Sequence, residues 1–308
     1  MIIYISRTLA KTLLTLFAVI TLVFFATRLS GSPLETFLGE GLTAEDRAMM
    51  IDYFGLNGSI WEQYARYMRG VLEGNFGLSF VERRPVADIV AERIGPSLQL
   101  LASALALTIC LSIPLGILAA IYRRSWIGTG IMMFAFVGYA VPNFILAIFM
   151  ILVFAFTLNW LPVVGNGSPA HFIMPTIALS GVLIAALTRF TRNAMLDVLG
   201  QDYMRTARAK GLPEWIVVIK HGLKNASVTI ASVLGLQIAA LAAAGNVVVE
   251  SIFSWPGIGE LLVTSAITRD YPVLQFGVIV VAVAVVVINA VIDIAYAFAD
   301  PRIRLAKG

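Results

Sequence analysis

Long apolar runs alternate with short polar segments along the whole chain. Six runs have roughly the length that a bilayer requires and lack the strict alternation of strands, so each predicts a transmembrane helix. A helix also pairs its own backbone groups where lipid offers no partner. The predicted spans cover residues 9–29, 98–121, 129–157, 172–193, 227–249 and 273–298. The sequence therefore predicts an all-α, polytopic membrane protein with six transmembrane helices.

Composition supports this class, because only 13% of the 308 residues are charged, about half the share of a soluble domain. The first run resembles a signal peptide, but Ala26-Thr27-Arg28 is no small-residue cleavage site, so we expect residues 1–30 to remain as an anchor helix. Cys110 lies in an apolar run, which favours a core or lipid-facing residue over a reactive thiol. His171 and His221 lack metal-ligand spacing, and we expect neither a metal nor a cofactor.

Basic residues gather in the segments on one side of the predicted spans. With the N-terminus inside, the inner segments hold 14 basic and 4 acidic residues, and the outer segments hold 8 basic and 13 acidic residues. An excess of Lys and Arg in short loops sets orientation, so both termini are predicted to be cytoplasmic. The pI of 9.3 then reflects topology and does not indicate nucleic-acid binding.

The polar segment at 31–96 is the only large predicted outer piece. Helices are expected at 43–54 and 60–72, followed by a turn at Gly74-Asn75-Phe76-Gly77. The segment is too short for a catalytic domain with its own core. It is interpreted either as a cap on the helix ends or as a contact surface for an external partner.

A basic segment at 195–226, centred on 202–225, separates the fourth and fifth spans. Gly211 can adopt the positive φ of a helix C-terminal cap, and Pro213 suits the first position of a new helix. Two short helices with a sharp turn are therefore predicted, the first kept small on one side by Thr206 and Ala207. The second is predicted to carry an apolar stripe of Trp215, Ile219, Gly222 and Leu223. Such a stripe either rests on the membrane surface or inserts into a partner protein.

At these residues the chain resembles the inner-membrane permease subunits of ABC importers, in the dipeptide, oligopeptide and nickel group. The family's Glu-Ala-Ala-x-x-x-Gly motif corresponds to Arg205-Thr206-Ala207 followed by Gly211, with Arg205 in place of the glutamate. A proline that often closes the motif would fall at Thr229, so less bending is expected at the start of the fifth span.

The resemblance covers nearly the whole chain and places it with the first of the paired permeases, which carries the large outer loop. Its motifs are Gly74-Asn75-Phe76-Gly77-Leu78-Ser79, Arg84-Pro85-Val86 with Ile89 and Arg93, Val141-Pro142-Asn143-Phe144, Trp160-Leu161-Pro162, Phe253-Ser254-Trp255-Pro256-Gly257, Arg269-Asp270-Tyr271-Pro272 and Asp300-Pro301-Arg302. It implies a type I ABC importer (MetI-like) permease fold in the bacterial inner membrane, with a core at 97–298 and a cytoplasmic tail at 299–308.

The resemblance also implies a function and partners. The subunit is expected to form half of the translocation pathway for peptides or a related small solute. Its partners would be a homologous second permease, two cytoplasmic ATPase subunits, a periplasmic or lipid-anchored substrate-binding protein and membrane lipid. In the family the basic segment docks on the ATPase. The corresponding residues are Tyr203, Arg205, Thr206, Ala207, Lys210, Gly211, Pro213, Trp215, Ile219, His221 and Leu223.

The chain is not expected to be an enzyme, because it lacks a Gly-x-x-x-x-Gly-Lys-Ser/Thr loop for nucleotide phosphates. ATP hydrolysis is expected in a separate subunit. Two rival readings remain: an ATPase-independent secondary transporter and a non-transporting membrane scaffold. A secondary transporter is expected to have internal sequence duplication and charged residues that converge at mid-membrane, and the sequence displays neither.

Several residues are candidates for a pathway or gate. Pro114 and Pro142 are predicted to interrupt the helical hydrogen bonds of the second and third spans. Gly138, Pro142 and Asn143 are interpreted either as residues that line a pathway or as a packing kink without a direct role. A short helix is predicted within 250–272. By resemblance this stretch, with Phe253, Trp255, Pro256 and Gly257, forms an outer lid; an interfacial loop anchored by Trp255 and Tyr271 is the alternative.

In the last span, Asn289 and Asp293 lie one turn apart on one face. Asp293 is about 7–8 Å from the predicted inner end. At this depth an interhelical hydrogen bond or ion pair is favoured over a proton relay.

Overall fold

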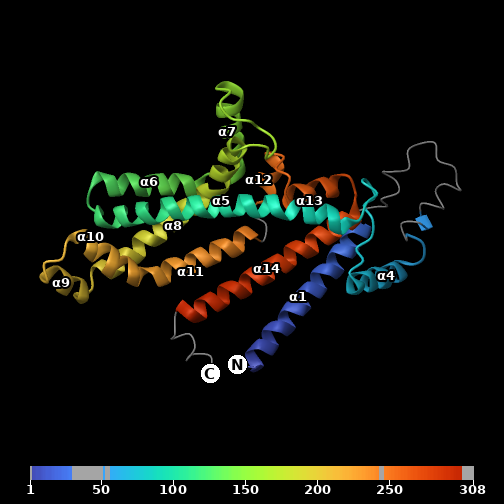
Figure 1. The fold of residues 1–308 in the computed structure, drawn as a ribbon, viewed down its shortest axis with the longest axis horizontal. Helices are drawn as coiled ribbons and strands as arrows, with labels where there is room; N and C mark the ends of the chain where they lie inside the picture. Colours follow the sequence, from blue (N-terminus) through green and yellow to red (C-terminus); the bar gives the residue numbers. More distant parts are fainter. Residues whose placement is uncertain (1, 30–50, 53–55, 243–245, 300–308) are drawn as a thin grey trace. The chain divides into compact units, whose positions relative to one another are not determined.

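The computed structural model of the chain describes residues 2–29, 51–52, 56–242 and 246–299. These residues form helices and connecting loops, with one isolated bridge between Leu78 and Pro85 as their only β-pairing (Figure 1). Within the described residues, five helices are long and apolar enough to cross a membrane, and one bent helix pair brings the number to six if it counts as a span. The predicted all-α, polytopic class is confirmed.

The first of two compact units comprises residues 1–97 and 256–286. It contains α1 (Ile2–Leu29), α4 (Ile60–Glu73), α13 (Ile258–Ile267) and the first parts of α5 (Val86–Ile121) and α14 (Tyr271–Ala299). A capping box between Ser59 and Glu62 begins α4, and Gly74 ends it at φ +74°. The predicted helix at 60–72 is thus confirmed, whereas most of the one predicted at 43–54 lies outside the described residues.

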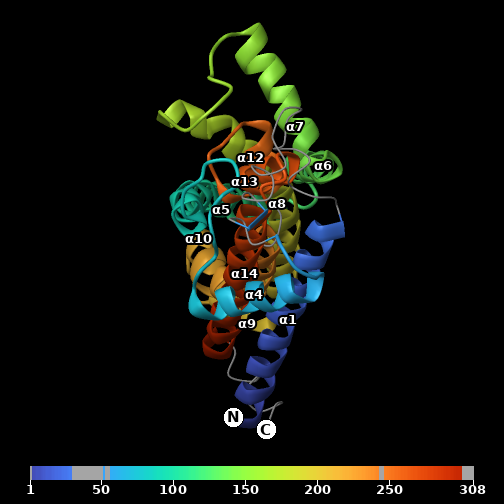
Figure 2. The same cartoon turned by 90° about the vertical axis from the view of Figure 1, so that its right-hand side faces the viewer.

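Aromatic side chains join α1 to α4, which Figure 2 shows lying against each other. Phe24 stacks on Tyr67 with the ring centroids 5.2 Å apart, and Phe25 meets Trp61 at 5.5 Å. A second cluster packs Val86 of α5 against Leu261 of α13 and Val273 of α14. The start of α5 is therefore buried by neighbours from the same unit.

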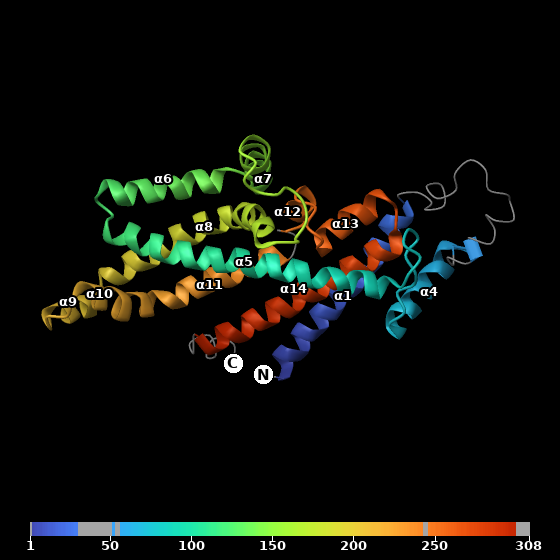
Figure 3. The same ribbon diagram turned by 45° about the horizontal axis from the view of Figure 1, so that its top comes forward.

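The second unit comprises residues 98–255 and 287–308. Its further elements are α6 (Trp126–Ala140), α7 (Asn143–Met150), the π-helix η1 (Ile151–Thr157), α8 (Pro169–Leu199), α9 (Asp202–Ala209), α10 (Glu214–Ile216), the π-helix η2 (Val217–Leu223), α11 (Lys224–Ala240) and α12 (Val247–Ile252). Helix α8 is the centre of this unit, since α6, α7, α11 and α12 all pack on it. Figure 3 shows α8 next to α6 and crossing α5.

The two prolines that were predicted to interrupt helices behave differently. At Pro142 the third apolar run, predicted as one span at 129–157, divides into α6 and the helical stretch Asn143–Thr157, which are bent by 97°. Pro142 has an extended ψ of 141° and begins the new helix. Pro114 lies inside α5, which continues through it as one helix, so the missing N–H of Pro114 interrupts the hydrogen-bond ladder without dividing the helix. A proline removes a single backbone hydrogen bond, which packed transmembrane helices tolerate.

Two helix boundaries differ from the boundaries of the predicted spans. Helix α5 begins at Val86, ahead of the predicted span at 98–121. Its first turns carry Asp88, Glu92 and Arg93, so the apolar pattern in the sequence did not extend to them. The predicted span at 227–249 holds two elements, since α11 ends at Ala240 and α12 is a separate helix.

Candidate functional site

A two-helix segment, which we call the elbow (residues 202–223), follows the end of α8. The turn between α9 and α10 depends on Gly211, which has φ +73° and donates its N–H to the carbonyl of Arg208 at 2.9 Å. A Cβ at Gly211 would meet nothing within 4 Å, so the backbone conformation and not crowding favours glycine. Pro213 is the N-cap of the second helix, one position before the first helical residue where it was predicted, and its carbonyl accepts from Val217 N–H at 3.1 Å. The predicted pair of short helices with a sharp turn is confirmed.

The inner side of the elbow is anchored. Met204 and Val217 are fully buried and Ala207 nearly so, and they pack with half-buried residues that include Leu199 of α8. Gly222 is buried as well, and a Cβ there would lie 3.2 Å from Cε of Met195 on α8. The elbow is therefore fixed to the end of α8 by its own small core.

The outer side of the elbow exposes large side chains. Trp215 is 69% exposed, Ile219 47% and Tyr203 43%. The predicted stripe is wrong at Gly222, which is buried while Trp215 and Ile219 are exposed. The cause is the π-helical turn η2, whose wider hydrogen-bonded ring changes which positions share a face.

The other candidate residues of this segment lie around these side chains. Arg205 is exposed and pairs with Asp202 at 3.7 Å. Thr206, Lys210 and Pro213 are exposed, whereas His221 and Leu223 are half-buried. Thr206 and Ala207 do not share one small side, because Ala207 alone faces the elbow's core.

Arg208 and Glu214 form an ion pair that the sequence analysis did not anticipate. The guanidinium donates from Nη2 to Oε1 at 2.9 Å and from Nε to Oε2 at 3.1 Å. These bonds link α9 to α10 across the turn and raise the pKa of Arg208. The sequence pattern that could have predicted this ion pair is the placement of opposite charges on the two sides of Gly211-Leu212-Pro213.

The pathway candidates of the third run lie at the α6–α7 bend. Gly138 lets α6 approach α8 closely, since a Cβ would sit 3.5 Å from Cβ of Ala185 and 3.8 Å from the carbonyl oxygen of Gly181. Pro142 is exposed and Asn143 half-buried at the bend. Gly138 therefore makes a packing contact with α8, and Pro142 lies at the bend between α6 and α7.

The candidates at 253–257 separate into a buried part and a helix start. Phe253 and Trp255 are buried in the largest core cluster of the second unit, where Trp255 meets Phe172 edge-on with centroids 4.5 Å apart. Pro256 is half-buried, and the buried Gly257 precedes α13, the predicted short helix. The interfacial anchor reading is wrong, because Trp255 is fully buried and Tyr271 is 4% exposed.

The polar candidates of the last span both lie on α14. The side chain of Asn289 is exposed. The side chain of Asp293 lies outside the described residues, so its predicted hydrogen bond or ion pair stays a prediction.

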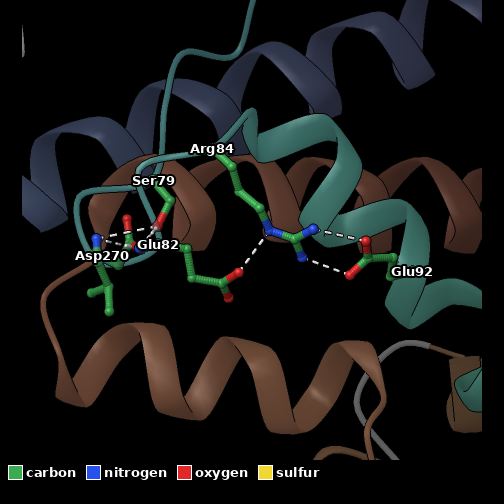
Figure 4. Close-up of polar contacts among 6 residues, drawn as sticks. Ser79, Glu82, Arg84, Glu92 and Asp270 are labelled. Atoms are coloured by element: carbon green, nitrogen blue, oxygen red, sulfur yellow. Dashed lines mark hydrogen bonds and ion pairs between the residues drawn. The ribbon is translucent and has the colours of Figure 1, made fainter.

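A buried carboxylate in the first unit was missed as a site. Asp270, only 3% exposed, accepts hydrogen bonds from Ser79 Oγ at 2.5 Å, Phe80 N at 3.0 Å and Val81 N at 3.4 Å (Figure 4). These four residues, here called the clamp, tie the loop before α5 to the turn between α13 and α14. Both segments were recognised as family motifs, but their pairing over 191 positions has no local signal.

An exposed charge cluster borders the clamp. Arg84 pairs with Glu82 at 2.7 Å and with Glu92 at 2.6 Å, as Figure 4 shows. These hydrogen bonds raise the pKa of Arg84, with Glu92 making the larger contribution.

Known proteins resemble both the sequence and the fold. The family model described as "Binding-protein-dependent transport system inner membrane component" matches residues 112–305. The chain is 40% identical over 302 residues to the glutathione transport system permease protein GsiC of Shigella flexneri serotype 5b (strain 8401) and of Escherichia coli (strain K12), covering 98% of each protein.

Two solved structures share the fold. An inward-facing MetNI methionine ABC transporter matches with a TM-score of 0.58 and 15% identity, over 69% of this chain and 96% of that chain. An amino acid ABC transporter matches with a TM-score of 0.50 and 14% identity, over 68% and 94%. These likenesses support the predicted MetI-like permease fold.

The fold and the comparisons together define a multi-pass inner-membrane permease of an ABC importer. The chain belongs to the family of binding-protein-dependent transport system inner membrane components. It is a permease subunit without catalytic activity of its own, and ATP hydrolysis takes place in a separate subunit. Such a permease works with a partner permease, an ATPase and a substrate-binding protein.

Proposed function

We propose that this subunit forms half of an import pathway for a small peptide such as glutathione, and that the elbow receives the force of ATP binding. The observation that carries the proposal is the exposed group of Tyr203, Trp215 and Ile219 on a segment whose inner side is already packed. Exposed aromatic and aliphatic side chains on a fixed scaffold suit the central contacts of a protein interface. The peptide substrate is supported by the 40% identical glutathione permeases.

The position of the elbow provides a mechanical route. Its core packs on α8, and η2 leads directly into α11, which also packs on α8. When ATP binding closes two ATPase subunits, the elbow would move with them and carry both helices. The pathway would then change from inward-open to outward-open, facing a loaded binding protein.

The remaining partners follow from the same scheme. One subunit supplies half of a pathway, so a homologous second permease completes a heterodimer. The distribution of Lys and Arg supports an elbow and both termini in the cytoplasm, with the substrate-binding protein on the other side.

The orientation is tested by cysteine labelling. In a Cys110→Ser background, Lys210→Cys places a thiol on the exposed elbow, and Asn75→Cys places one on the exposed loop after α4. In sealed spheroplasts, a membrane-impermeant maleimide should label Asn75→Cys at once and Lys210→Cys only after permeabilisation. Labelling of Lys210→Cys from outside would overturn the topology.

Docking is tested at Gly211 in the assembled transporter. Gly211→Pro cannot adopt φ +73° and lacks the N–H that bonds to Arg208, so transport and stimulation of the ATPase should be lost. Gly211→Asn is the matched control, since asparagine tolerates this conformation, and it should retain most activity. Wild-type behaviour of Gly211→Pro would refute a coupling role for the turn.

Two further measurements separate the rival functions. Vesicles that hold both permeases but no ATPase should show no uptake, and uptake there would favour a secondary transporter. Mass spectrometry of the cognate binding protein, purified without added ligand, should identify glutathione or a similar peptide.

A further inference from the structure

An arginine stands at the end of the apolar part of α8. The first 20 residues of this helix, Pro169 to Thr188, include no Asp, Glu, Lys or Arg. They measure about 30 Å, the thickness of the hydrocarbon core. Arg189 follows directly. Its Cζ lies 4.9 Å from the ring centroid of Tyr139 on α6 and 5.7 Å from that of Phe190.

The guanidinium of Arg189 reaches back toward the apolar part of its helix. Gly138, the neighbour of Tyr139, packs against Gly181 and Ala185, which precede Arg189 by two turns and one turn. Helical side chains lean toward the N-terminus of their helix, so Arg189 can meet the Tyr139 ring at this level. An arginine near the end of a span more often extends outward to the polar interface. The ring of Tyr139 therefore holds the cation against α6, beside the apolar stretch of α8.

Within the described part of the chain, Arg189 has no carboxylate oxygen within 4.0 Å of its nitrogens. Its side chain is exposed, and Tyr139 is 53% exposed. A charge facing lipid at depth is costly, and such residues almost always face the bundle interior or a water-filled cavity. The face shared by α6 and α8 around Arg189 thus suits an aqueous path and not acyl chains.

We infer that Arg189, held on the ring of Tyr139, is a carboxylate-binding position in the translocation path, and that the transported solute carries a carboxylate. The inference rests on the proposed transport function and narrows its substrate. A guanidinium offers paired N–H donors that match the two oxygens of a carboxylate, while the cation–π contact limits the orientations of the fork. The positive charge of Arg189 repels a bare divalent metal ion. A neutral glycan has no anionic group that the guanidinium could bind.

The test uses the complete importer in proteoliposomes, with both permeases, the ATPases and the binding protein. The probes are glutathione and its C-terminal amide, each measured for kcat and KM of uptake. Arg189→Gln should lower kcat/KM for glutathione by about 10- to 100-fold, the range expected for a charge-assisted bidentate contact. The preference for the acid over the amide should shrink with it. Because the binding protein is the same in every sample, the change in this preference reports on the permease alone.

Three variants sharpen the result. Arg189→Lys should retain part of the preference for the acid over the amide, since lysine keeps the positive charge but lacks the paired N–H donors of the guanidinium. Arg124→Gln removes an exposed arginine just before α6 and should leave kcat/KM and the preference unchanged. Tyr139→Leu removes the ring under the guanidinium and should lower kcat/KM for glutathione less than Arg189→Gln does. It replaces Arg189→Gln as the test if that variant does not accumulate in the membrane.

Each contrary result has a definite meaning. Uptake by the wild type with an unchanged preference in Arg189→Gln overturns this inference alone, whereas a wild-type importer that moves neither probe nor any other carboxylate solute overturns the proposed function as well. An equal loss for both probes that occurs only in vesicles of anionic lipid would assign Arg189 to lipid headgroups. Loss of co-purification with the second permease would assign it to the subunit interface, and either assignment refutes the carboxylate site.

Discussion

The clamp and the elbow use their side chains in opposite ways. In the clamp, the Asp270 carboxylate is buried and accepts three hydrogen bonds from its own chain. In the elbow, buried methionine, alanine and valine form the anchor while Trp215 and Ile219 remain exposed. A buried polar group that is fully paired holds chain segments together. Large exposed apolar side chains on an anchored segment instead remain available to another protein.

The contrast predicts which substitutions act on the subunit itself and which act on its assembly. A residue that is paired or packed inside the chain should lower the unfolding temperature of the isolated permease when it is truncated. A residue whose contacts lie outside the chain should leave that temperature unchanged and affect the assembled transporter.

Asp270→Ala should have the largest effect on stability. It removes the acceptor of the Ser79 hydroxyl and the carboxylate bond of the Phe80 amide, while the Val81 amide keeps Ser79 Oγ at 3.2 Å. The loss should cost about 3 kcal/mol or more. Thermal unfolding in detergent measures the change. Glu73→Ala, which truncates an exposed carboxylate at the end of α4, is the control and should stay within about 0.5 kcal/mol. A small effect at Asp270 would remove the basis for calling the clamp structural.

Met204→Ala should come next. Met204 is fully buried in the core that fixes the elbow to α8, and such truncations cost about 2–5 kcal/mol. Because loss of this side chain should let the elbow open locally, faster hydrogen exchange at residues 202–223 should accompany a loss of ATPase stimulation. Ile219→Ala, which is exposed, should leave exchange unchanged. If exchange in Met204→Ala equals wild type, the elbow is not anchored through this side chain.

The sequence was most informative where the signal is local. Apolar length located the spans, and the glycine and proline around Leu212 predicted the turn of the elbow, because Gly211 and Pro213 restrict the backbone by themselves. The fate of Pro114 and Pro142 depended on neighbouring helices, and the burial of Gly222 depended on a π-helical turn. The pairing of Ser79 with Asp270 arises only from tertiary packing. Such contacts leave no periodic pattern in the sequence.

Arg208→Ala should have a modest effect. The Arg208–Glu214 pair is exposed to solvent, with side chains 40% and 57% accessible, so its contribution should be about 0.2–1 kcal/mol and fall with added salt. A double-mutant cycle with Glu214→Ala isolates the pair. A coupling energy that does not respond to salt would mean that the two side chains act through other contacts.

Trp215→Ala should have the smallest effect on the isolated subunit, within about 0.5 kcal/mol, because the side chain is 69% exposed. In the assembled transporter it should weaken ATPase binding by about tenfold or more, as expected when a central interface tryptophan is truncated. Co-purification at increasing ATPase concentration measures this change. Trp126→Ala is the matched control, since Trp126 is 83% exposed at the start of α6 and lies outside the elbow. If Trp215→Ala instead lowers the unfolding temperature as much as Met204→Ala, Trp215 belongs to the elbow's own packing. The contacts of Trp215 would then lie within the chain, as those of the clamp do. The exposed surface of the elbow would no longer support a docking partner.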